Sequence, residues 1–137
     1  MKIIKYIIVF YTALSAVVMA QENQVLYCTD TNSNGFIANE KGDGYKRSAF
    51  KPSRYTVSIG DLLGGAYDMT MKSPSGSIYF QCRNIFTVTR NAIACNDTTD
   101  NFILNLDTLN YTFSRGFGWV LGVEDTLSIS YGTCAKF

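Results

Sequence analysis

YTVSIGDLLGGAYDMTMKSPSGSIYFQC, residues 55–82, is the stretch that decides the fold. Apolar and polar side chains alternate in three segments of it, with apolar positions at Tyr55, Val57 and Ile59, at Tyr67, Met69 and Met71, and at Ile78, Phe80 and Cys82. A period of two residues is typical of strands that bury one face. Serine, proline and glycine at 73–76 give a turn signal between the last two segments. The stretch therefore predicts consecutive antiparallel strands.

The same alternation continues toward the end of the chain, at Leu109, Tyr111 and Phe113 and at Leu127, Ile129 and Tyr131. Turn-forming residues at 96–101 and 106–108 separate these segments. The only helical candidate, 61–63, runs into Gly64 and Gly65, and glycine disfavours a helix. We predict an all-β fold, a small antiparallel barrel or sandwich of about eight short strands.

The first twenty residues have the pattern of a cleavable signal peptide. Lys2 and Lys5 precede an apolar run at 6–14, and small or branched residues lead up to Ala20. The run is too short to span a bilayer, which needs about 20 apolar residues. We expect cleavage after Ala20, one β-rich domain at 21–137, and a soluble periplasmic or secreted product without membrane insertion.

The charge balance gives no sign of the positive surface that a polyanion would bind. The chain has 12 Lys and Arg against 11 Asp and Glu, and loss of Lys2 and Lys5 would leave ten cations. Nucleic acids and anionic lipids attract proteins that carry clustered positive charge. We therefore expect neither as a partner.

Four cysteines, Cys28, Cys82, Cys95 and Cys134, lie beyond the expected cleavage point. An even number of cysteines in a small exported domain indicates disulfides, whereas zinc sites favour close cysteine pairs and histidine, and this chain contains no histidine. Of the three connectivities we predict Cys82–Cys95, within reach of neighbouring strands, and Cys28–Cys134, which joins the first strand to the last. No turn sequence lies midway between Cys82 and Cys95, so a bulge or a wide loop is expected there.

The absence of histidine also excludes Ser-His-Asp and Cys-His catalytic sites. Ser48 and Lys51 have the spacing of a lysine-activated serine, but Pro52 and the strand that follows argue against the helix that this chemistry needs. Paired carboxylates such as Asp97 and Asp100 lie in turn-like sequence, where aspartate is common. We predict that the protein is not an enzyme, with no catalytic residues and no cofactor.

DTNSNGFI, residues 30–37, matches the first two-thirds of a calcium-binding loop. Oxygen ligands would come from Asp30, Asn32 and Asn34, and a glycine follows at loop position six. Position twelve, which needs a bidentate carboxylate, is Lys41. A polar connection between two strands accounts for the same residues, so a calcium-binding β module is an alternative and no metal is expected.

Aromatic residues make up 14% of the chain. Alternation places Tyr111 and Phe113 on one face, which we expect to be core. The glycines that flank Phe117 favour a bend or bulge, which could leave Phe117 or Trp119 on a rim as a platform for sugar or peptide. We treat both as candidate partner-binding residues.

Six short motifs are spread over the chain: YCTD (27–30), GF (35–36), FKPxxYTV (50–57), FILN (102–105), YTF (111–113) and ISYGTC (129–134). Together they resemble a group of small exported bacterial β-rich proteins of unknown function. The resemblance rests on the cysteine pattern and on a closing Gly-x-Cys, and it implies no activity.

SGSIY, residues 75–79, is similar to the Ser-Gly-x-x-Tyr loop of the periplasmic inhibitors of C-type lysozymes, which are small β-barrels. That resemblance implies that Ser75, Gly76 and Tyr79 contact the enzyme. Ordinary turn chemistry before a strand explains the same residues. The sequence thus predicts a non-catalytic binding or interaction module whose partner is an unknown protein or carbohydrate of the cell envelope, with a lysozyme-inhibitor-like protein as an alternative.

Overall fold

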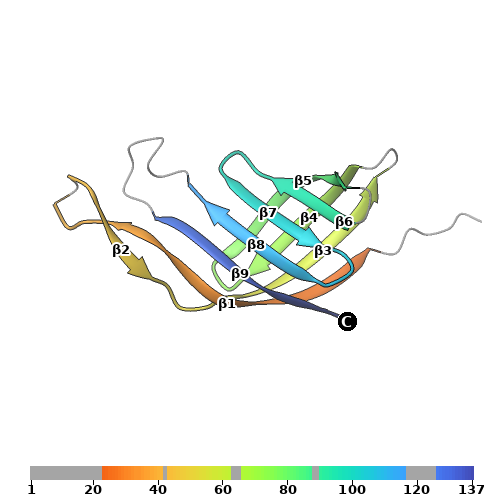
Figure 1. Cartoon of the computed structure of the whole chain (residues 1–137), viewed down its shortest axis with the longest axis horizontal. Coiled ribbons are helices and arrows are strands. Elements are labelled where there is room, and N and C mark those ends of the chain that lie inside the picture. Colours follow the sequence, from red (N-terminus) through yellow and green to blue (C-terminus); the bar gives the residue numbers. More distant parts are fainter. Residues whose placement is uncertain (1–22, 42, 63–65, 88–89, 117–125) are drawn as a thin grey trace, which may run out of the picture.

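A computed structural model describes residues 23–41, 43–62, 66–87, 90–116 and 126–137. The expected signal peptide, and Phe117 and Trp119, lie outside these residues. The described chain forms nine strands (Figure 1): β1 Gln24–Ala38, β2 Tyr45–Ala49, β3 Arg54–Leu62, β4 Ala66–Ser73, β5 Gly76–Thr87, β6 Arg90–Asn96, β7 Asp100–Asn105, β8 Asn110–Arg115 and β9 Leu127–Lys136. None of the described residues belongs to a helix long and apolar enough to cross a membrane.

The sheet closes on itself. All neighbouring strands pair antiparallel in the order β2-β1-β3-β4-β5-β6-β7-β8-β9, and β1 also pairs with β9. Eight strands therefore form a closed antiparallel barrel, and β2 is an extra strand that pairs with the C-terminal part of β1 (Figure 1). The all-β prediction is confirmed, and of the two predicted architectures the barrel is the one found.

Strand β1 differs from the expected N-terminal third. Instead of two short strands joined by a polar connection, one strand of 15 residues runs through with a bulge between Asp30 and Asn32. The long strand forms because β9 pairs along both halves of it, while β3 and β2 share its other edge. Residues 50–53 separate β2 from β3, and they include Pro52, which has no N–H to donate to the ladder.

The barrel interior is apolar and rich in aromatic rings. Buried side chains from all eight barrel strands meet there, among them Leu26, Val57, Met69, Met71, Phe80, Ile93, Phe102, Leu104, Tyr111 and Phe113. Phe102 lies at the centre of a ring cluster, with its centroid 5.1 Å from Tyr111 and 6.2 Å from Phe113. Each large apolar side chain contributes about 1.5–3 kcal/mol by burial. The predicted core role of Tyr111 and Phe113 is confirmed.

In β9 the predicted alternation has the opposite sense. Ile129 and Tyr131 face outward, and Ser130 and Gly132 face the interior. Cys134 must face inward to reach Cys28, and residues at even spacing from Cys134 share its face. The backbones of β1 and β9 also approach closely here, since a Cβ on Gly132 would collide with the Thr29 carbonyl oxygen. Only small side chains fit on the inner face.

Both predicted disulfides are present. Cys28 and Cys134 are directly opposite on β1 and β9, and Cys82 and Cys95 are opposite on β5 and β6. The prediction of a bulge or a wide loop between Cys82 and Cys95 is wrong, because β5 pairs with β6 without interruption from Gln81–Asn96 to Thr87–Arg90. Two such bonds are compatible with an oxidising extracellular or periplasmic location.

Candidate functional site

A carboxylate is buried inside the apolar barrel. Asp30, at the bulge of β1, is 5% exposed. One of its oxygens accepts a hydrogen bond from the Tyr111 hydroxyl at 2.6 Å. The other accepts from the Ser53 amide at 3.0 Å and from the Tyr55 hydroxyl at 3.3 Å. Alternation places Asp30 on the same inner face as Leu26 and Cys28, just before the bulge, and the three donors connect β1 to β8, to β3 and to Ser53, which precedes β3.

The two tyrosines keep their protons in this environment. Burial raises the pKa of Tyr55 and of Tyr111 above the ordinary value, and the hydrogen bond to the Asp30 carboxylate and its negative charge raise both pKa values further. The hydroxyls therefore act as fixed donors. The arrangement satisfies a buried charge next to the bulge, and both carboxylate oxygens accept hydrogen bonds from the protein itself.

The calcium candidates do not come together. Asp30 points into the barrel, whereas Asn32 and Asn34 are on the outer face of β1, where the Asn34 amide donates to the Asn32 side-chain oxygen at 2.7 Å. In a strand, residues on either side of a bulge do not converge as they do in a calcium loop. Within the described part of the chain no group of three or more His, Cys, Asp or Glu is placed to hold a metal ion.

An open cleft of about 760 Å³ lies on the outer surface, between the β4–β5 hairpin and the turn that joins β6 to β7. Strand β5 begins at Gly76 but pairs with β6 only from Gln81 onward. Residues 76–80 therefore have ladder partners on the β4 side alone. The β6–β7 turn does not reach as far as the tip of the β4–β5 hairpin. The cleft lies where the hairpin extends beyond this turn.

The cleft combines one exposed ring with polar groups. Tyr79 is 74% exposed, and six polar residues line the cleft around it: Asp68, Thr70, Gln81, Asn96, Asp97 and Thr98. Register explains this gathering, because Tyr79 is opposite Thr70, and Asp68, Gln81 and Asn96 form one row across three strands. These side chains offer hydroxyl, amide and carboxylate groups at the spacing of neighbouring strands, about 4.8 Å.

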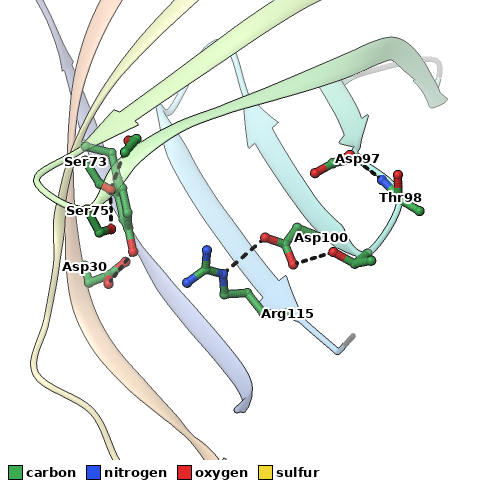
Figure 2. A network of polar contacts seen from close by, with 10 residues as sticks. Asp30, Ser73, Ser75, Asp97, Thr98, Asp100 and Arg115 are labelled. Atoms are coloured by element: carbon green, nitrogen blue, oxygen red, sulfur yellow. Dashed lines mark hydrogen bonds and ion pairs between the residues drawn. The ribbon is translucent and has the colours of Figure 1, made fainter. Parts of the chain in front are cut away.

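The turn that forms one wall is held in place by its own hydrogen bonds (Figure 2). The Asp97 amide donates to the Asp100 carbonyl oxygen at 3.0 Å, and the Asp97 carboxylate accepts from the Thr98 amide. Arg115 on β8 donates from Nε to the Asp100 carboxylate at 3.1 Å. Asp97 has the turn role predicted for it, whereas Asp100 is the first residue of β7 and pairs with Arg115.

The proposed Ser-Gly-x-x-Tyr contact residues divide between two places. Ser75 and Gly76 form the exposed tip of the β4–β5 hairpin, where the Ser73 and Ser75 hydroxyls are 2.8 Å apart and Gly76 has a φ of 142° (Figure 2). Tyr79 lies further along β5 and lines the cleft, which neither tip residue does. The exposure that an inhibitory loop requires is present from Ser75 to Ser77 and at Tyr79, with Ile78 partly buried between them.

Sequence reasoning identified Tyr79 but missed Asp68, Gln81 and Asn96. Each is an isolated polar residue at an outward position of a strand, which by itself indicates only a solvated face. Their common signal is register, and register is not visible in one strand at a time. No protein-family model, no curated protein and no solved structure matches this chain.

Proposed function

We propose that this protein is a non-catalytic binding module, exported to an oxidising compartment, that holds a carbohydrate in the cleft at Tyr79. The observation that carries the proposal is the 74% exposed ring of Tyr79 beside a row of amide and carboxylate groups. A ring so exposed contributes little to the core, and an amphipathic aromatic side chain in a cleft is a common anchor for ligands.

Sugar rings suit this arrangement because they have two kinds of surface. Their C–H faces pack on an aromatic ring, and their hydroxyls need donors and acceptors at short spacing. Gln81 and Asn96 supply both, and Asp68 supplies a charged acceptor, which forms stronger hydrogen bonds than a neutral one. All three stand on strands, so their backbone is already ordered before a ligand binds.

The test is titration calorimetry of the purified protein with a panel of neutral oligosaccharides. We expect one class to bind, and Tyr79→Ala to weaken its binding at least tenfold. Tyr131→Ala is the matched control, since Tyr131 is an exposed tyrosine on the outer face of β9 and does not line the cleft. Absence of binding at millimolar sugar, or equal losses in the two variants, would contradict the proposal.

A second candidate, inhibition of a lysozyme-type muramidase, is favoured by the exposed hairpin tip at Ser75 and Gly76. A rigid tip can enter an enzyme cleft at low entropic cost, and the contact between the Ser73 and Ser75 hydroxyls stiffens this one. Residual C-type lysozyme activity at micromolar excess of the protein is the measurement. Inhibition that is lost in Ser75→Ala and in Tyr79→Ala supports this function, and full enzyme activity excludes it.

A further inference from the structure

A second hollow, of about 340 Å³, lies on the other side of strand β4 from the cleft. Outward residues of β1, β3 and β4 line it, among them Tyr27, Thr29, Arg54, Thr56 and Lys72. Register places them next to one another, because Thr29 is opposite Arg54 and Thr56 is opposite both Tyr27 and Lys72. The hollow therefore brings two cations together around threonine hydroxyls.

Within the described part of the chain, neither Arg54 nor Lys72 forms an ion pair. Both side chains are exposed, and no carboxylate is among the described residues that line the hollow. Among the described residues, the ion pair that does form joins Arg115 to Asp100. Two neighbouring cations on a concave surface, without an ion-pair partner among the described residues, attract an external anion.

The residue types fit an oxyanion. The planar guanidinium of Arg54 can donate two parallel hydrogen bonds to a carboxylate, phosphate or sulfate, and the ammonium of Lys72 adds a mobile point charge. Thr29 and Thr56 offer hydroxyl donors between them. The Tyr27 ring, 5.5 Å from the ring of Phe137, adds an apolar wall beside the charges.

The hollow and the cleft are close enough for one ligand. Lys72 in the hollow and Thr70 in the cleft are consecutive outward residues of β4, about 7 Å apart along the strand. Tyr79 is opposite Thr70. An oligosaccharide packed on Tyr79 can thus extend an acidic substituent across β4 to Lys72 and Arg54.

We propose that this hollow, here called the basic hollow, binds the carboxylate, phosphate or sulfate group of an acidic oligosaccharide whose neutral part occupies the cleft. The inference rests on the proposed function and defines its ligand as an anionic glycan. It predicts that the protein discriminates between acidic and neutral forms of the same sugar. It also predicts weaker binding of the acidic form at high salt, because exposed charges are screened.

The experiment compares a uronic-acid tetrasaccharide with its carboxyl-reduced, neutral counterpart, and adds a sulfated and a phosphorylated oligosaccharide to distinguish the sources of the anion. We expect the wild-type protein to bind at least one acidic probe ten times more tightly than the neutral one. The variant Arg54→Gln with Lys72→Gln should lose this preference and keep its affinity for the neutral sugar. The control Lys46→Gln with Arg47→Gln removes the same charge from exposed positions of β2 and should keep the preference.

Equal binding of acidic and neutral probes by the wild-type protein would overturn the inference, as would no binding of any acidic probe. A preference that survives Arg54→Gln with Lys72→Gln, or is lost equally in the β2 control, would also overturn it. Tyr79→Ala separates the two proposals. If that variant still binds acidic probes through the basic hollow with unchanged affinity, the hollow is supported and the carbohydrate cleft is contradicted.

Discussion

Replacing Tyr111 with phenylalanine removes one oxygen from the centre of the barrel and leaves the ring in place. The ring is 3% exposed and stacks on Phe102 at 5.1 Å, so its packing should not change. What is lost is the hydrogen bond to the Asp30 carboxylate at 2.6 Å. Hydrogen bonds to charged groups contribute about 1.5–3 kcal/mol, and Asp30 keeps its other two donors. We expect Tyr111→Phe to lower the free energy of unfolding by an amount within that range at pH 7, measured by urea unfolding.

The same variant should change the response to alkali. The pKa of Tyr111 is raised in the folded state, mainly by burial, so above about pH 10 the unfolded chain loses this proton while the folded chain keeps it. The unfolded state then binds fewer protons, and the stability that Tyr111 contributes falls as pH rises. At pH 11, one unit above an unfolded pKa of about 10, the stability advantage of the wild-type protein over Tyr111→Phe should shrink by about 1.4 kcal/mol.

Tyr131→Phe is the control, because the hydroxyl of this half-exposed tyrosine is on the outer face. It should change stability by less than about 0.5 kcal/mol. A loss for Tyr111→Phe as small as that of the control would refute the role of the buried hydrogen bond. An advantage of the wild-type protein that is the same at pH 7 and pH 11 would refute the pKa argument.

Three further changes test other parts of the barrel, each by urea unfolding. Replacing Cys28 and Cys134 by alanine should cost about 5 kcal/mol of stability, and replacing Cys82 and Cys95 about 3 kcal/mol. The first disulfide closes the longer loop, with a sequence separation of 106 against 13. A larger loss for the second pair would contradict the account based on loop entropy. Gly132→Ala should cost about 1–3 kcal/mol of stability, because the new Cβ collides with the backbone of Thr29. The control Gly116→Ala has open space around the added Cβ and should change stability by less than about 0.5 kcal/mol. Asp100→Asn should cost about 1 kcal/mol at low salt, and a loss that does not shrink at 1 M salt would contradict an ion pair with Arg115.

The sequence alone was sufficient for the fold class and the disulfides. Alternation at period two identifies strands through local chemistry, since successive side chains of a strand face opposite ways. The cysteine pairing followed from one short and one long separation in a meander of strands. Alternation failed in β9, where Ile129 and Tyr131 occupy the outer face, because the closeness of β1 and β9 permits only small side chains inside.

The candidate sites were decided by the tertiary structure. Asp68, Gln81 and Asn96 lie on three strands, and Arg54 and Lys72 on two, so nothing in their local sequence distinguishes them from solvated surface. Strand register, the step between β5 and β6, and closure of β1 on β9 bring them together, and each of these is a long-range interaction. The local sequence pattern determines which residues can share one face of a strand. Which of these faces come together depends on pairing between distant segments, and only the folded chain determines that pairing.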